Sequence, residues 1–200
     1  MKKNLFLTGL SGTGKSTLIH RALRAAGLFP VGFRTLRVYD GQGKVCAYVV
    51  SDIRSPERGV RFMNRVEGEK WHRDFLLFCR TAHEALDGAE TFDVVLMDEI
   101  GGKELLDPTF YNRVVSLLES PVFCIGVLKD RAGVERQIKN HDPDNAAYRK
   151  AYEGLRSFLE ESTNSVIYTV TEKNREEIFN RIVSLLKIAV ISIESVSKEK

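Results

Sequence analysis

The sequence predicts an α/β fold in which a mostly parallel central sheet lies between two layers of helices. Short apolar runs typical of buried strands alternate along the chain with segments of helical periodicity. The run Asp93–Met97 is apolar on both faces, as expected of a central parallel strand that is covered on two sides. Two hundred residues suffice for one domain with its own core. We expect that domain to span residues 1–194, followed by a frayed tail at 195–200.

The first part of the chain predicts a strand, a helix and a hairpin. Leu5–Thr8 is a short apolar run that stops at a glycine, which is typical of a buried strand. Apolar positions at helical spacing then predict a helix over Lys15–Ala26. The expected β-hairpin pairs Val31–Val38 with Lys44–Ser51 through the glycine-containing turn Asp40–Gly43.

The segment after this hairpin is the best candidate for a mobile loop, because residues 51–71 are polar, basic and weakly patterned. The hairpin and the loop together, residues 31–71, form an excursion from the sheet. Trp71 is expected to pack in the core or anchor the loop rather than stack on a base. On a helix, four arginines of the loop would form one basic stripe, although the modest net charge favours a solvated face. These arginines are Arg54, Arg58, Arg61 and Arg65.

The middle of the chain alternates helices and strands. Helical spacing returns over Arg73–Leu86, and the apolar strand Asp93–Met97 follows. A proline opens the next helix, Pro108–Leu118, and Pro121 ends it before the strand Val122–Val127.

The remainder contains a charged helical excursion and a last strand and helix. Residues 129–161 have a helical pattern that is interrupted at 141–144, and we expect a lid-like insertion there. Ser165–Val170 predicts the last strand. Asn174 is expected to cap the final helix, with Glu177 three residues later as its reciprocal partner.

Composition and charge exclude several classes of protein. Thirty Lys and Arg against 27 Asp and Glu leave a net charge of +3, which is too mild for a nucleic-acid-binding footprint. The longest apolar runs fall far short of the roughly 20 residues that cross a bilayer, and no cleavage site follows the N-terminal run. Three cysteines without a CxxC spacing suit buried thiols in a reducing compartment. We therefore expect a cytoplasmic protein without a membrane partner, and its oligomeric state stays open.

A phosphate-binding loop lies between the first predicted strand and the first predicted helix. Residues 9–16 satisfy the Walker A pattern G-x-x-x-x-G-K-[ST] in full. The glycines let successive N–H groups turn toward phosphate oxygens, Lys15 supplies a charge to the β- and γ-phosphates, and the Ser16 hydroxyl is placed to ligate Mg²⁺. The expected nucleotide-binding residues here are Gly9, Leu10, Ser11, Gly12, Thr13, Gly14, Lys15, Ser16 and Thr17.

An acidic pair, Asp98 and Glu99, follows the apolar strand. A carboxylate at the carboxyl end of a central strand faces the same crevice as the phosphate loop. We expect Asp98, in the Walker B position, to hold Mg²⁺ through its water shell, and Glu99 to polarise a water aimed at the γ-phosphorus. Asn174 and Arg175 follow the last strand and are candidates for contacts with the base; the alternatives are a helix cap and a surface charge. The four histidines have no metal-ligand spacing.

Four segments occur in the order found in one known family. They are Phe6–Leu18, Gly32–Thr35, Asp98–Leu105 and Val170–Arg175. Through them the chain resembles the P-loop nucleoside-triphosphatase family that includes the human cancer-related nucleoside-triphosphatase and thermophilic relatives. The resemblance implies a P-loop NTPase fold and Mg²⁺-dependent hydrolysis of ATP, GTP, CTP and UTP to diphosphate and phosphate. It also implies broad base tolerance and slow turnover, and the chain has no Asn-Lys-x-Asp motif that would indicate selectivity for GTP.

The excursion at 129–161 offers candidates for an arginine finger, a cationic side chain that neutralises charge on the transferred phosphoryl group. The acidic residues interleaved with these arginines favour a solvated helix face instead. The candidates are Arg131, Arg136 and Arg149.

Two other functions stay open at the level of the sequence. One is a P-loop kinase that phosphorylates a nucleotide or another small molecule, with residues 31–71 forming an acceptor pocket and 129–161 a lid. The other is a nucleotide-dependent switch that binds a protein or RNA. Release of phosphate without an added acceptor would argue against the kinase, and a partner that binds only with a non-hydrolysable analogue would favour the switch. The fold alone does not separate these functions.

Overall fold

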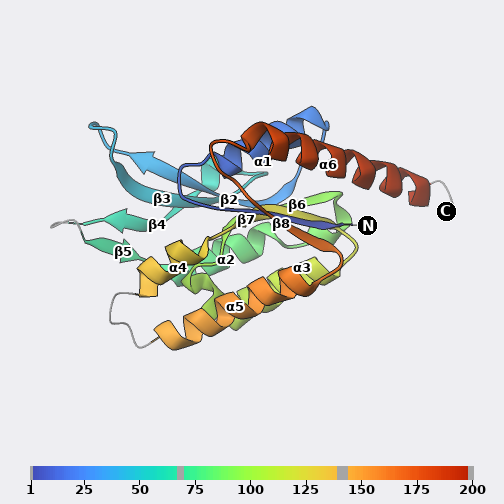
Figure 1. The fold of residues 1–200 in the computed structure, drawn as a ribbon. Coiled ribbons are helices and arrows are strands. Elements are labelled where there is room, and N and C mark those ends of the chain that lie inside the picture. Colours follow the sequence, from blue (N-terminus) through green and yellow to red (C-terminus); the bar gives the residue numbers. More distant parts are fainter. Residues whose placement is uncertain (1, 67–69, 139–143, 198–200) are drawn as a thin grey trace.

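An eight-stranded sheet forms the centre of the computed structural model, which describes residues 2–66, 70–138 and 144–197, with side chains to residue 189 (Figure 1). The strand order is β5-β4-β3-β2-β6-β7-β1-β8. The parallel strands are β2 (Val31–Tyr39), β6 (Val94–Ile100), β7 (Phe123–Leu128), β1 (Asn4–Thr8) and β8 (Ser165–Thr169). The antiparallel strands, added beyond β2, are β3 (Val45–Asp52), β4 (Val60–Arg65) and β5 (Trp71–Arg73). The predicted α/β class with a mostly parallel sheet is confirmed.

Helices cover both faces of this sheet, which gives the three layers that the sequence predicts (Figure 1). One face carries α1 (Lys15–Ala25) and α6 (Arg175–Ser197). The other carries α2 (Phe75–Ala85), α3 (Pro108–Glu119) and α5 (Asn145–Glu161). The short helices are η1 (Pro56–Arg58), η3 (Ala89–Thr91), η4 (Lys103–Leu106) and α4 (Arg131–Ile138).

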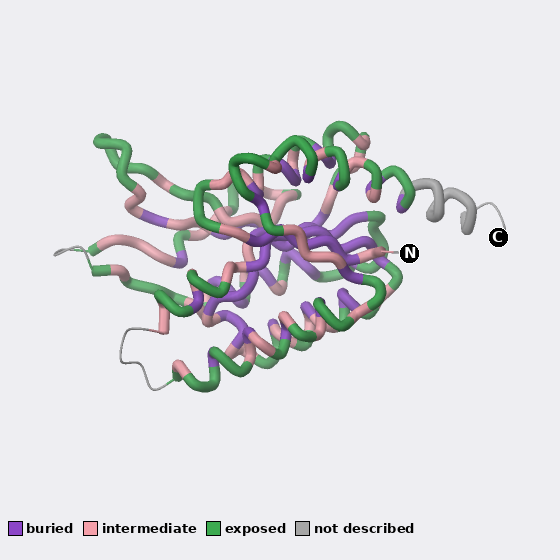
Figure 2. The backbone as a smooth tube through the Cα atoms, in the orientation of Figure 1, coloured by how far each residue is buried: buried purple, intermediate pink, exposed green. Residues whose placement is uncertain are grey.

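The central strands alternate between two hydrophobic cores because successive side chains of a strand point to opposite faces. In β1, Leu5 and Leu7 pack with α1 and α6, whereas Phe6 packs with the helices of the other face. All three side chains are fully buried, and Figure 2 shows the buried residues gathered along the centre of the sheet. This double burial explains why β1, β6 and β7 are continuous apolar runs.

The core on the face that carries α2, α3 and α5 contains a cluster of aromatic rings. Phe110 of α3 lies 6.0 Å from Phe33 and 5.8 Å from Phe78, measured between ring centroids. Phe110→Ala is expected to lower the free energy of unfolding by about 3–5 kcal/mol, because it leaves a cavity in this cluster. The measurement is urea denaturation. Phe29→Ala is the matched control, since Phe29 is 90% exposed and its loss is expected to cost within about 0.5 kcal/mol; equal effects of the two changes would contradict the packing described.

The prediction of a loop over residues 51–71 is wrong, because half of the described part of this segment is strand. β4 pairs with β3, β5 pairs with β4, and Phe62 of β4 is buried in the aromatic cluster. Apolar Val60 and Phe62 alternate with Arg61, which is a strand signal that the basic composition obscured. Trp71 packs against Tyr48 with ring centroids 5.7 Å apart, in agreement with the expected packing role.

The four loop arginines do not form a helical stripe. They lie on a turn, on η1 and on β4, where neighbouring side chains point in different directions. Arg54 pairs with Asp52 at 2.9 Å, and Arg65 lies over the ring of Trp71. The four arginines therefore lie at the antiparallel end of the sheet and do not form one basic surface on a helix.

The prediction of a lid-like insertion over residues 129–161 is also wrong for the longer helix of this segment, α5. Tyr148, Tyr152, Leu155 and Leu159 of α5 are buried against the sheet, so α5 is a layer of the core. Its spacing of buried side chains at three and four residues is that of a core-facing helix. The interruption expected at 141–144 lies outside the described residues except for Asp144.

The end of the chain differs from the prediction in two respects. Helix α6 continues to Ser197, past the start of the expected frayed tail, and residues 198–200 lie outside the described part. The Asn174 side chain bonds the loop before the helix, accepting from the Thr171 N–H and donating to the Thr169 carbonyl, rather than making the expected reciprocal cap. An asparagine side chain can bond nearby backbone in this way as readily as it caps a helix.

Two of the three thiols, Cys79 and Cys124, are buried as expected, and Cys46 is half-buried. Burial raises the pKa of each buried thiol to about 12. Within the described residues, no helix combines the length and the apolar character needed to span a membrane.

Candidate active site

The phosphate-binding loop joins the carboxyl end of β1 to the first turn of α1. Gly9 has φ of 125°, and a Cβ built there would lie 2.5 Å from the carbonyl oxygen of Val170. Gly14, the residue before α1, has φ of 86°. Glycine is the residue that tolerates this backbone conformation and this close approach. The two glycines therefore let the loop pass directly against the chain that leaves β8.

Lys15 lies almost buried at the floor of this loop, 9% exposed. Its Nζ donates to the carbonyl oxygens of Gly9 at 2.7 Å and Leu10 at 2.8 Å. Burial lowers the pKa of Lys15, and the nearby carboxylates Glu99, Asp130 and Asp98 offset part of this effect. The ammonium group has three N–H donors, so one donor remains beyond these two bonds.

Ser16 and Asp98 meet across the gap between α1 and β6. The Ser16 hydroxyl donates to Oδ1 of Asp98 at 3.0 Å. Asp98 is only 3% exposed, and burial raises its pKa to about 7, against the smaller lowering effect of the Ser16 bond. The Asp98 carboxylate and the Ser16 hydroxyl together offer two hard oxygen ligands, which suit a divalent cation. Such a cation would also favour the ionised form of Asp98, which burial disfavours.

Glu99, the next residue of β6, forms an ion pair with Lys129 at the end of β7. Lys129 Nζ lies 2.8 Å from Oε1 of Glu99. Burial alone would lower the pKa of Lys129, but the Glu99 carboxylate, together with Glu104 and Tyr48, more than offsets this and the pKa is raised. The Tyr152 hydroxyl donates to the Lys129 carbonyl oxygen at 2.8 Å. The pair therefore has a position fixed by both the sheet and α5.

Glu104 of η4 is a buried carboxyl group, 5% exposed, at the same end of the sheet. Its Oε1 accepts from the N–H groups of Gly101 at 2.9 Å and Gly102 at 2.6 Å. Burial raises the pKa of Glu104, and the Lys129 charge and these N–H groups oppose the rise. Glu104 thereby fixes the backbone that follows Glu99.

Glu104→Gln is expected to stabilise the protein at pH 8.5 and to have little effect at pH 4. Because the folded-state pKa is raised, ionisation of Glu104 costs stability progressively as the pH rises above the unfolded value of 4.5 and through the folded value. Glutamine can keep both N–H bonds through its own Oε1 and carries no charge. Urea unfolding of wild type and variant across this pH range measures the difference, and a difference independent of pH would contradict the prediction.

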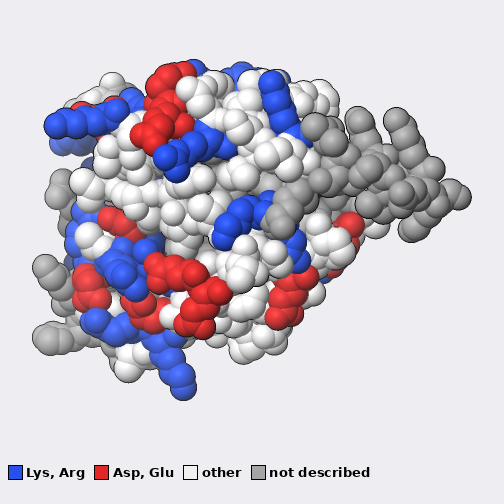
Figure 3. All heavy atoms as spheres, turned by 45° about the vertical axis from the view of Figure 1, so that its right-hand side comes forward, with Lys and Arg blue, Asp and Glu red and all other residues white. Residues whose placement is uncertain are grey.

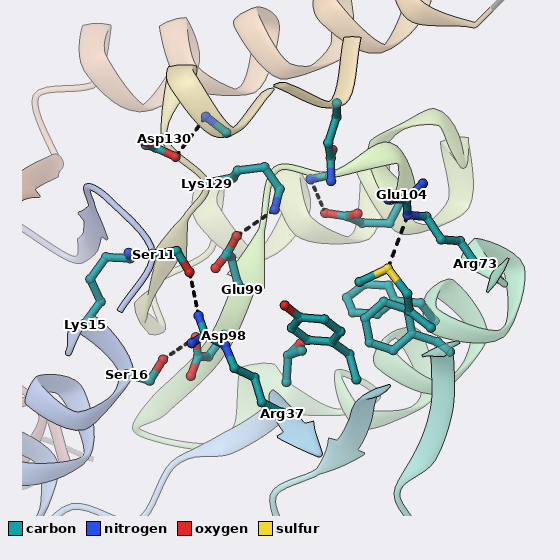
Figure 4. Close-up of a pocket in the computed structure, with 18 of the residues that line it drawn as sticks. Ser11, Lys15, Ser16, Arg37, Arg73, Asp98, Glu99, Glu104, Lys129 and Asp130 are labelled. Carbon is teal, nitrogen blue, oxygen red and sulfur yellow. Dashed lines mark hydrogen bonds and ion pairs between the residues drawn. The ribbon is translucent and has the colours of Figure 1, made fainter. Parts of the chain in front are cut away.

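Two cavities meet at the phosphate loop, and Figure 4 shows the charged residues of the first. The first cavity has a volume of about 420 Å³ and includes Lys15, Ser16, Asp98 and Glu99 in its wall. The second has a volume of about 580 Å³ and lies between the loop and residues 169–172. Gly9, Ser11 and Asp130 line both.

Of the three candidate finger arginines, two are held in ion pairs at the surface. Arg131 pairs with Glu153 at 3.1 Å, and Arg149 pairs with Glu135 at 2.7 Å. Side chains of both signs also alternate on the face shown in Figure 3. Arg136 of α4 differs, because it lines the first cavity.

The remaining nucleotide-binding candidates lie around the loop. Thr13 lines the second cavity, and Thr17 is exposed on α1. Asn174 supports the loop at 169–174 through the two bonds described above. The Arg175 guanidinium lies against Gly14, with Cζ 3.7 Å from the position that a Cβ there would occupy.

The structure thus brings together Lys15 and Ser16 of α1 with Asp98 and Glu99 of β6. Sequence analysis missed Lys129, Glu104 and Arg37 as parts of the same cluster. Arg37 of β2 reaches across to the phosphate loop, where it donates to the Ser11 hydroxyl at 2.6 Å. The signal for Lys129 was its place directly after the apolar strand β7, because the carboxyl ends of parallel strands meet at one edge.

Comparison with known proteins gives a family and several relatives. The model of a family described as NTPase matches residues 4–149. Nucleoside-triphosphatase THEP1 from Thermotoga maritima is 27% identical over 201 residues, covering 92% of this chain and 95% of that protein. The cancer-related nucleoside-triphosphatase of Homo sapiens is 32% identical over 137 residues, covering 60% of this chain and 72% of that protein.

A solved structure has the same fold. The crystal structure of THEP1 from the hyperthermophile Aquifex aeolicus matches with a TM-score of 0.63 and 22% identity, covering 94% of this chain and 99% of that one. At this identity the match supports the arrangement of the sheet and helices. The chemistry of the site follows from its residues and not from this match.

Proposed function

Because this chain belongs to the NTPase family, we propose that it hydrolyses nucleoside 5′-triphosphates to nucleoside diphosphate and phosphate, with Mg²⁺ as cofactor. The relatives are named nucleoside-triphosphatases, which supports this class of reaction. The observation that carries the proposal is the cluster at the carboxyl ends of β1 and β6. There a phosphate loop, the Ser16–Asp98 contact and an oriented glutamate adjoin one cavity.

Binding of the triphosphate would use the loop and Lys15. The loop N–H groups and the first turn of α1 offer donors and a positive dipole end to phosphate oxygens. Lys15 Nζ, anchored on the Gly9 and Leu10 carbonyls, has a donor left for an oxygen of the β- or γ-phosphate. Catalysis by these groups is positioning and neutralisation of charge.

The residues present fit a magnesium ion. Ser16 and Asp98 are hard oxygen ligands 3.0 Å apart, and a cation would favour the ionised form that burial of Asp98 disfavours. When bound, the ion would neutralise charge on the phosphate oxygens.

Glu99 would orient the attacking water and accept its proton. It lies one residue beyond Asp98, and the ion pair with Lys129 restricts the directions in which its carboxylate can point. A positioned carboxylate is a common general base in hydrolysis. With Arg131 and Arg149 held by glutamates, we expect slow turnover, on the order of 10⁻³ s⁻¹ or below, as in nucleotide hydrolases that act without an arginine finger.

The nucleoside would occupy the second cavity. Asn174 would act there by holding the loop at 169–174, and Arg175 by its contact with Gly14. None of the described residues that line this cavity is aromatic, so the base would be held without a stacking platform. This supports broad tolerance of the base.

Phosphate release is expected from ATP, GTP, CTP and UTP within about tenfold of one another in kcat/KM, and EDTA is expected to abolish it. The reason is that the cation and the loop contact the phosphates, which all four share. The measurement is release of inorganic phosphate from the purified chain with no acceptor added. Absence of release with all four nucleotides, at concentrations where calorimetry detects binding, would refute the proposal.

A further inference from the structure

The first cavity extends well past the cluster that would contact the γ-phosphate. A triphosphate on the loop with its nucleoside in the second cavity would direct its γ-phosphate toward Lys15, Ser16 and Asp98 in the first. Figure 4 shows Arg73 and Glu104 on the opposite side of this cavity from Lys15 and Ser16. The nucleoside triphosphate would leave that far side unused.

Aromatic side chains form one wall of the far side. Tyr48 comes from β3, Phe62 from β4, and Phe75 and Phe78 from α2. Tyr48 and Phe75, which line the cavity, are partly exposed, whereas Phe62 and Phe78 are buried. Such a wall favours a flat ring over a sugar or an aliphatic chain.

Cationic groups from three separate elements line the same cavity. They are Arg37 of β2, Arg73 of β5 and Arg136 of α4, all exposed. Guanidinium groups bind phosphate through paired N–H donors. A metal–triphosphate complex would contact the loop, so Arg73, on the far side, suggests that a second anion binds there.

Four carboxylates among the described residues line the cavity: Asp98 would face the magnesium ion, and Asp130 accepts from the Gly133 N–H at 3.0 Å. The other two are compatible with an anionic guest. The charge of Glu99 is balanced by Lys129 at 2.8 Å. Glu104, 5% exposed, has one oxygen bonded to the Gly101 and Gly102 N–H groups and lines the cavity as an acceptor for a donor such as the amino group of a base.

We propose that the far side of this cavity binds a nucleoside monophosphate, whose phosphate takes the γ-phosphoryl group of the triphosphate in place of water. The ring would lie against Tyr48 and Phe75, and the phosphate between Arg73 and Lys15. The inference rests on the proposed function for the placement of the γ-phosphate. It makes the antiparallel strands β3, β4 and β5 the acceptor wall of a kinase.

The transfer step is balanced without further reactants. The bond between the γ-phosphorus and the β,γ-bridging oxygen breaks, and its electron pair stays on the leaving nucleoside diphosphate. A bond forms between the γ-phosphorus and an oxygen of the monophosphate, giving a second diphosphate. A phosphate dianion has no proton to lose, so transfer needs no general base, whereas hydrolysis does.

This difference gives the test. The chain with Glu99→Gln is incubated with Mg²⁺, γ-labelled ATP and AMP, CMP, GMP or UMP in turn, and labelled diphosphates are separated by chromatography. Labelled diphosphate is expected from at least one monophosphate, at ten times or more the level without monophosphate, while phosphate release stays at background. Lys15→Met, purified in the same way, controls for contaminating kinases and is expected to give none. No labelled diphosphate from any of the four, from a variant that still binds Mg-ATP, overturns the proposal.

Binding provides a second readout. Calorimetric titration of the productive monophosphate into wild type saturated with Mg²⁺ and a non-hydrolysable ATP analogue is expected to give one site. Arg73→Gln is expected to raise its Kd about tenfold, and Arg80→Gln, at an exposed arginine of α2 outside the cavity, to leave it unchanged. Nucleoside or ribose 5-phosphate alone is expected to bind at least tenfold more weakly. Equal Kd values for the two arginine variants would overturn the assignment of the site.

The wild type separates this inference from the proposed function. Phosphate release without acceptor, together with no transfer and no monophosphate binding, removes the second site and leaves the hydrolase. No phosphate release and no transfer removes both.

Discussion

Replacement of Glu99 by glutamine is expected to lower kcat for nucleoside-triphosphate hydrolysis by about 10²–10⁴-fold, with the Kd for Mg-nucleotide changed less than about threefold. Glutamine keeps the shape of the side chain and an oxygen that can accept from Lys129, but it cannot take a proton from water. The loss is therefore expected in the chemical step rather than in binding. Single-turnover phosphate release and calorimetric nucleotide binding, measured on the same preparation, separate the two.

Glu84→Gln is the matched control for this change. Glu84 is exposed on α2 and lines neither cavity, so its replacement is expected to leave both kcat and Kd as in wild type. Retention of more than a tenth of the wild-type kcat by Glu99→Gln would mean that another group orients the water.

Replacement of Lys15 by methionine is expected to reduce kcat/KM by about 10³-fold or more, through both binding and chemistry. Methionine fills nearly the same volume but removes the ammonium charge and the bonds to Gly9 and Leu10. The triphosphate then loses its cationic contact, and the loop loses two internal bonds. Initial rates across a range of nucleotide concentrations give kcat and KM separately.

Circular dichroism and urea unfolding show whether the Lys15 variant is folded. Lys187→Met, at an exposed lysine of α6, is the matched control and is expected to behave as wild type. A folded Lys15→Met variant that hydrolyses nucleotide within tenfold of wild type would exclude the assigned role.

The sequence predicted the parallel half of the fold well because each strand there is covered on two sides. That burial forces β1, β6 and β7 to be apolar runs, and the glycine spacing of the phosphate loop is set by local backbone geometry. The loop and the Asp98–Glu99 pair could therefore be placed at one edge before any contact was known.

The antiparallel half was predicted less well. β4 and β5 have one covered face and many charged residues, so their alternation is weak and resembles that of a loop. The Lys129–Glu99 pair joins residues 30 positions apart, and the reach of Arg37 to Ser11 depends on how far β2 extends beyond β6. Such contacts follow from tertiary packing and have no local signature.

The position of β1 has a consequence for the order in which the protein matures. β1 is made first, yet its two partners are β7 and β8, which follow more than a hundred residues later. During synthesis β1 has neither of its strand partners until β7 is made, so we expect the emerging chain to be most aggregation-prone before β7 leaves the ribosome. Because Gly9 packs against Val170, the nucleotide site is assembled only when the chain beyond β8 has docked. Nucleotide binding would thus report completed folding of nearly the whole chain, and truncations that end before residue 170 would lack it.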